Sequence, residues 1–97
     1  MKTETLNGSH IRCYDNGGKT ADRYTVIYLD LPERAVNMFA AVGMSADPFH
    51  AQGFGMHTTA QPGRHLGARI PFAKLPADCQ KLVRQDLGAV TADKVGA

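Results

Sequence analysis

The tripeptide Gly18-Lys19-Thr20 has the residue types most directly associated with chemistry, because a phosphate-binding loop ends in this way. The full motif needs a glycine five residues before its last glycine, and that position holds Cys13. It also needs a helix after the lysine, whereas residues 24–31 have the composition of a strand. The tripeptide is therefore predicted to form a hairpin turn.

Three oxygen-bearing residues of the same segment, Asp15, Asn16 and Asp22, raise the question of a calcium site. The spacing of an EF-hand loop is absent, and Lys19 would bring a positive charge into the site. Asp15 has Arg12 nearby in the sequence, and Asp22 has Arg23. We therefore expect the aspartates to accept hydrogen bonds from turn amides and to pair with these arginines.

Three histidines, His50, His57 and His65, lie in or at the end of a glycine-rich segment and are the candidate ligands for zinc. Their spacings match no short zinc motif, and no Cys-x-x-Cys pair accompanies them. A structural alternative is that they hydrogen-bond irregular backbone. The enzymatic alternative is a small metal- or nucleotide-handling protein that uses these histidines with Asp15 or Asp22. No cofactor is assigned to the chain, and zinc at the histidines is the alternative.

Cys13 and Cys79 are the candidate nucleophiles. Cys13 has the same strand parity as Ile11, and Cys79 lies on the apolar stripe of a predicted helix. Buried cysteines are usually inert, so no catalytic residue is assigned. The preferred interpretation is a protein that is not an enzyme.

A hairpin surface is the preferred binding site, because arginine and tyrosine are enriched in binding hot spots. Two interpretations stay open for the tyrosines Tyr14, Tyr24 and Tyr28. They form an exposed patch on one sheet face, or they cap the core with their hydroxyls in water. The residues assigned to binding are Arg12, Tyr14, Asp15, Lys19, Asp22, Arg23 and Tyr24.

A β-hairpin is the first element expected to position these residues. Alternating apolar residues predict a strand over 9–14, and β-branched and aromatic residues predict a second over 23–31. Asn16-Gly17-Gly18 suits the tight turn between them.

The remaining chain predicts helices and one long loop. Pro32 is expected to open a helix whose apolar face holds Ala35, Met38, Phe39 and Val42, and Gly43 is expected to end it. Residues 43–65 are predicted to form a long loop, in which short strands could lie at 53–59. A short strand is predicted over 69–72.

A second helix is predicted to begin at residues 75–78 and to bury Cys79, Leu82, Val83 and Leu87. Gly88 is expected to end it, leaving a frayed tail over 89–97.

Length and composition limit the function classes. Ninety-seven residues make one domain, with a core expected over about 9–88. The net charge is +2 and the basic residues are scattered, which neither supports nor excludes nucleic-acid binding. The chain has no apolar run near the length of a membrane span and no secretory signal, so a cytoplasmic protein with reduced cysteines is expected.

The string from Cys13 to Thr20, continued by residues 22–26, resembles a motif of small uncharacterised proteins of bacteria, phages and plasmids. The resemblance to that group continues at residues 47–50, 53–55, 65–67, 70–72 and 75–76. As a whole it covers about residues 10–87. The resemblance implies an accessory protein of a mobile element, a class that includes inhibitors of host defence such as anti-CRISPR proteins. It implies no activity and no catalytic residue.

The sequence therefore predicts an α+β fold: a small antiparallel sheet built on a β-hairpin, with one or two helices packed on one face. It predicts a non-enzymatic protein that binds a protein partner, with an anti-CRISPR-like role implied by the resemblance. The alternatives are the histidine-dependent enzyme and a nucleic-acid-binding accessory protein. The oligomeric state stays open, because an exposed edge strand can pair across a two-fold axis.

Overall fold

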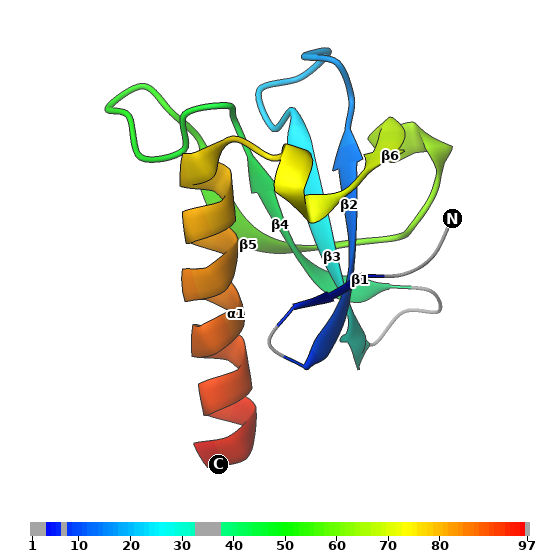
Figure 1. The fold of residues 1–97 in the computed structure, drawn as a ribbon, viewed down its shortest axis with the longest axis vertical. Helices are drawn as coiled ribbons and strands as arrows, with labels where there is room; N and C mark the ends of the chain where they lie inside the picture. The colour runs from blue at the N-terminus through cyan, green and yellow to red at the C-terminus, as the bar shows by residue number, and fades with distance from the viewer. Residues whose placement is uncertain (1–3, 7, 33–37, 97) are drawn as a thin grey trace.

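The computed structural model describes residues 4–6, 8–32 and 38–96, with side chains described as far as residue 89. These residues form an α+β domain in which six antiparallel strands make one sheet and a C-terminal helix packs on it (Figure 1). The strands are β1 (Glu4–Leu6), β2 (Ser9–Asp15), β3 (Tyr24–Pro32), β4 (Phe39–Met44), β5 (Gly55–Ala60) and β6 (Ala68–Ile70). Two single-turn 3₁₀ helices, η1 (Arg64–Leu66) and η2 (Phe72–Lys74), precede α1 (Ala77–Gly96). The predicted fold class is confirmed.

The predicted hairpin is formed by β2 and β3, which pair antiparallel from Ile11 opposite Tyr28 to Asp15 opposite Tyr24. The order of strands in the sheet is β1-β2-β3-β4-β5, and β6 adds to β2 beyond β1. The hairpin is therefore central, with further strands on both of its sides.

The helix predicted between Pro32 and Gly43 is wrong, because residues 39–44 form strand β4 between β3 and β5. Ala35 of its expected apolar face lies outside the described residues. Residues 40–44 are all buried. A short run of small and apolar residues suits a strand covered on both faces as well as a helix, so periodicity does not separate the two.

The segment predicted as a long loop over 43–65 contains strand β5 at residues 55–60, which confirms the short strand allowed near 53–59 and pairs along the whole of β4. The turn before β5 is tight at Gly53, where a Cβ atom would overlap the carbonyl oxygen of Asp47. Only glycine fits such a close approach of two backbone segments.

Helix α1 begins near the predicted position but does not end at Gly88, because it continues to Gly96 through the expected tail. Cys79, Val83 and Leu87 are buried and Leu82 packs beside them, as the sequence predicts. Gly88 is an exposed interior residue of the helix.

The two faces of the sheet are packed differently. One face carries the main core, in which β2, β3 and β4 pack against η2 and α1. The opposite face, called the open face below, carries a smaller cluster around Tyr14, Ile27 and Ala41, partly covered by Leu66 of η1. In the part of the chain described, no helix is both long enough and apolar enough to cross a membrane.

Candidate binding surface

The turn between β2 and β3 is held by its own side chains. Asp15 Oδ1 accepts a hydrogen bond from Gly17 N at 2.8 Å, and Asn16 Oδ1 accepts from Gly18 N at 2.8 Å and Lys19 N at 3.0 Å. Gly17 and Gly18 have φ values of 78° and 89°, a conformation that favours glycine. The exposed Lys19 is therefore presented by an ordered turn.

Arg23 is tied to the base of this turn. Its Nε donates to Asp15 Oδ1 at 2.8 Å and its second terminal nitrogen donates to Asp15 Oδ2 at 3.2 Å. The hydrogen bond from Arg23 holds the pKa of the Asp15 carboxyl below its ordinary value, and Asp15 raises the pKa of Arg23 in return. The Arg23 guanidinium also lies 5.1 Å from the centre of the Tyr24 ring. Arg23 therefore orders the turn in addition to any role in recognition.

The tyrosines do not form an exposed patch. Tyr14, Tyr24 and Tyr28 are only 3%, 7% and 0% exposed, because β2 and β3 are central strands with packed side chains on each face. Nor is the hydroxyl of Tyr28 in water, since it donates to Asp86 Oδ2 of α1 at 2.8 Å. Binding through Tyr14 or Tyr24 would use the small part of each ring that remains accessible.

Arg12 lies on β2 opposite Ile27 and two residues before Tyr14, so its side chain leaves the sheet on the open face. It is half-buried. Its Nε atom is the one buried side-chain nitrogen or oxygen of the described residues that has no hydrogen-bond partner. A buried donor without a partner is costly, so an incoming acceptor would gain by reaching it.

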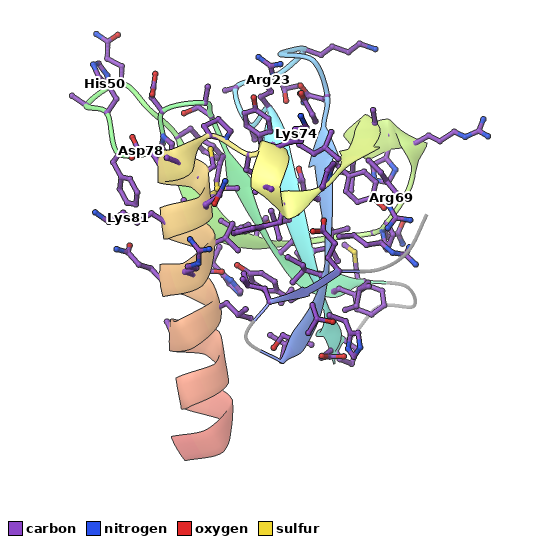
Figure 2. All side chains as sticks on the ribbon, in the orientation of Figure 1. Arg23, His50, Arg69, Lys74, Asp78 and Lys81 are labelled. Carbon is purple, nitrogen blue, oxygen red and sulfur yellow. The ribbon has the colours of Figure 1, made fainter. Side chains whose placement is uncertain are left out.

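A cavity of about 370 Å³ lies beside Tyr14 on this face and is called the arginine pocket below. Its lining residues are Tyr14, Gly63, Arg64, Gly67, Ala68 and Arg69. Arg69 is directly opposite Tyr14 in the pairing of β2 with β6, so its side chain shares the face of Tyr14 and Arg12. Figure 2 shows Arg69 beside β6 and Arg23 at the neighbouring turn. Among the described residues the lining holds arginines and no acidic residue, which suits a negatively charged group, and Arg69 also makes a further interaction within the chain.

A second cavity of about 340 Å³ also borders η1. Asp22 and Thr25 of the hairpin, Thr58 of β5, and His65 and Leu66 of η1 contribute to its lining. Asp22 packs over Gly43, where a Cβ atom would lie 3.3 Å from that of Asp22. The hairpin thus contributes the Asp22 carboxylate to this cavity and Tyr14 to the arginine pocket.

The three histidines are not brought together. His57 lies on β5 with Nδ1 3.0 Å from Asp86 Oδ2 of α1, whereas His65 lies by the cavity on the open face. His50 accepts a hydrogen bond from Gln52 N at 3.2 Å in the loop before β5. Within the described ranges no three His, Cys, Asp or Glu side chains form a group able to hold a metal ion. The alternative zinc site of His50, His57 and His65 is therefore not assembled in the described part of the chain.

The cysteines face the core, as their parity predicts. Both are buried, and burial raises the pKa of Cys13 to about 12 and that of Cys79 to about 11. The Cys79 thiol donates to the Ser45 carbonyl oxygen at 3.2 Å. Neither thiol has the thiolate character that a nucleophile needs.

Sequence reasoning missed Arg64 and Arg69, which lie in a predicted loop and at the start of a predicted strand. No local pattern distinguishes them from the other scattered basic residues. Only the pairing of β6 with β2 and the return of η1 over the sheet bring them to Tyr14. Comparison with protein-family models, with curated proteins and with solved structures finds no match to this chain.

Proposed function

We propose that this chain is a non-enzymatic binding protein that holds a protein partner on the open face of its sheet. The observation that carries the proposal is the arginine pocket, where Arg64 and Arg69 line a cavity whose described residues include no acidic one. Arg12 leaves the sheet on the same face. Arginine is the residue type that binds carboxylates in a bidentate manner. An aspartate or glutamate of the partner is therefore the group that enters the pocket.

The β2–β3 turn supports the same proposal. Its hydrogen bonds involve Asp15, Asn16 and the amides of residues 17–19, so the turn is ordered before any partner arrives. A preorganised loop loses little conformational entropy on binding. Lys19 at its tip and Asp22 at the second cavity would contact groups of the partner around the arginine pocket.

The resemblance of the hairpin motif to accessory proteins of phages and plasmids supports a narrower proposal. In this proposal the partner is a component of a bacterial defence system in the cytoplasm, and the chain inhibits it as anti-CRISPR proteins do. This step rests on the resemblance, whereas the binding face rests on the geometry.

The test compares two charge-reversal variants, one double and one single, in an affinity capture from bacterial lysate. The Arg64→Glu/Arg69→Glu variant should lose the proteins that the unaltered chain captures, because it places carboxylates where the partner's carboxylate binds. Lys74→Glu is the control, because Lys74 is an exposed basic residue on η2 outside the pocket. Unchanged thermal melting would show that both variants fold. Capture of the same proteins by the double reversal would contradict the proposal.

The salt dependence of binding distinguishes the nucleic-acid alternative from binding to a protein. Binding to phosphates falls steeply as salt rises, because bound counterions are released. We expect the captured partner to be a protein whose retention survives nuclease treatment. A partner that is removed by nuclease, with an affinity that falls steeply with salt, would favour the nucleic-acid alternative instead.

A further inference from the structure

The sheet ends on β5, and this edge is unlike the other end of the sheet. Residues 55–59 are all exposed, and β5 contains no charged residue and no proline. At the other end, β1 and β6 have three residues each, and Pro71 follows β6 directly. Natural sheets usually protect an exposed edge with charge, proline or a short strand. The protection is present at β1 and β6 and absent at β5.

The backbone groups that β5 presents outward follow from the hydrogen-bond pattern. Ser45 N donates to Phe54 O at 2.7 Å and Phe54 N donates to the Ser45 hydroxyl at 2.9 Å, so the backbone groups of residues 45 and 54 face each other as in a hydrogen-bonded pair that continues the register of β4 with β5. Hydrogen-bonded pairs alternate along an antiparallel ladder, so the next are 43 with 56 and 41 with 58. The N–H and C=O groups of Gly55, His57 and Thr59 consequently point away from β4.

We propose that a second copy of this chain pairs with that edge, β5 against β5, antiparallel about a two-fold axis at His57. In this register His57 is opposite His57 of the second copy, and Gly55 is opposite its Thr59. All three outward-facing residues then form hydrogen-bonded pairs. The two sheets become one continuous sheet, with both α1 helices on the same face because the axis is perpendicular to it.

The chemistry of the edge favours a second copy over a foreign strand. Across a two-fold axis every group near the centre meets groups of its own kind, so an edge with charged side chains would repel itself. None of the six residues of β5 is permanently charged. Met56 is 53% exposed and would face Thr58 of the second copy, which removes apolar surface from water. The imidazole of His57 is already held by Asp86 and does not have to move.

The oligomeric state tests this proposal directly. Light scattering or sedimentation should give a mass that rises from monomer to dimer with concentration. Thr59→Pro removes one outward-facing N–H and should shift the equilibrium to monomer, whereas Thr59→Val keeps that N–H and the preference for a strand and should behave as the unaltered chain does. A chain that is monomeric over the whole accessible concentration range overturns the proposal, as does a Thr59→Pro variant that dimerises normally.

A cross-linking experiment tests the register without relying on a proline in a strand. Only residue 57 is opposite its own copy, at the Cα separation of about 5.5 Å typical of a hydrogen-bonded pair, which a disulfide can span. Oxidised His57→Cys should therefore give a covalent dimer, and Thr59→Cys should not. The native cysteines are buried and do not compete. Equal cross-linking of both variants, or of neither, overturns the register. These readouts are independent of the arginine pocket.

Discussion

Tyr28 and Asp86 join the centre of the sheet to the helix, because the Tyr28 hydroxyl donates to Asp86 Oδ2 across 2.8 Å. The same oxygen lies 3.0 Å from His57 Nδ1 on the edge strand. Burial raises the pKa of Tyr28 above its ordinary value, and Asp86 raises it further, so the hydroxyl remains a donor. One carboxylate thus connects β3, β5 and α1.

Removal of the Tyr28 hydroxyl should destabilise the domain. Tyr28→Phe leaves Asp86, which is mostly buried, without its tyrosine donor, and a hydrogen bond to a charged group contributes about 2 kcal/mol. Chemical denaturation should show a lower free energy of unfolding by about this amount. Tyr24→Phe is the control, because Tyr24 is also buried and its hydroxyl makes no hydrogen bond to another described residue. Equal losses in both variants would contradict a special role for the contact with Asp86.

The Asp15–Arg23 pair should make stability depend on pH in acid. The pKa of Asp15 is lower in the folded chain than its ordinary value of 3.8, so the pair stabilises the fold above that pH and the stabilisation is lost as pH falls through the lower, folded value. Asp15→Asn keeps an oxygen acceptor for Gly17 N but has no charge. Unfolding curves should show the native chain more stable than Asp15→Asn at neutral pH and equally stable at strongly acidic pH. A difference independent of pH would contradict this account.

The two cysteines should be unreactive in the folded protein. With the pKa of Cys13 near 12 and that of Cys79 near 11, little thiolate exists at neutral pH and access is blocked by burial. A thiol-specific reagent should label neither residue until denaturant is added. Lys19→Cys provides the matched exposed thiol on the β2–β3 turn and should react at once. Rapid labelling of the native cysteines under the same conditions would show that the core opens.

Two glycines should respond to alanine in opposite directions. Gly67 has φ of 100°, and its Cβ atom would overlap the backbone of Asp15 and Asn16, so Gly67→Ala should cost about 2 kcal/mol. Gly88 is an exposed helix residue with open space around it, so Gly88→Ala should stabilise the chain by about 1 kcal/mol. Thermal or chemical melting measures both. A destabilising Gly88→Ala would indicate that α1 does not continue past residue 88.

Much of the fold follows from local sequence. The β2–β3 hairpin is recognisable because its strand residues and its Asn16-Gly17-Gly18 turn agree with each other, and α1 is recognisable from its buried stripe. Strand β4 is not, because residues 39–44 are apolar without a period and are decided by their neighbours in the sheet. The apolar residues of β4 have a face to bury only because β3 and β5 flank it.

The candidate site also combines features that the sequence predicts with features that it does not. The residue types at the turn predict that Asp15 accepts a hydrogen bond from a turn amide, and Gly17 N donates to it. The expected pairing of Asp15 with Arg12 and of Asp22 with Arg23 is wrong, because Arg23 pairs with Asp15 across the hairpin. The arginine pocket and the contact between Tyr28 and Asp86 could not be predicted, because each joins residues far apart in the chain through strand pairing and helix packing. The sequence by itself determined the hairpin, the turn and the buried face of α1, which depend on short-range backbone preferences. The tertiary structure alone decided which charges meet on the open face, because that depends on how the sheet brings distant segments together.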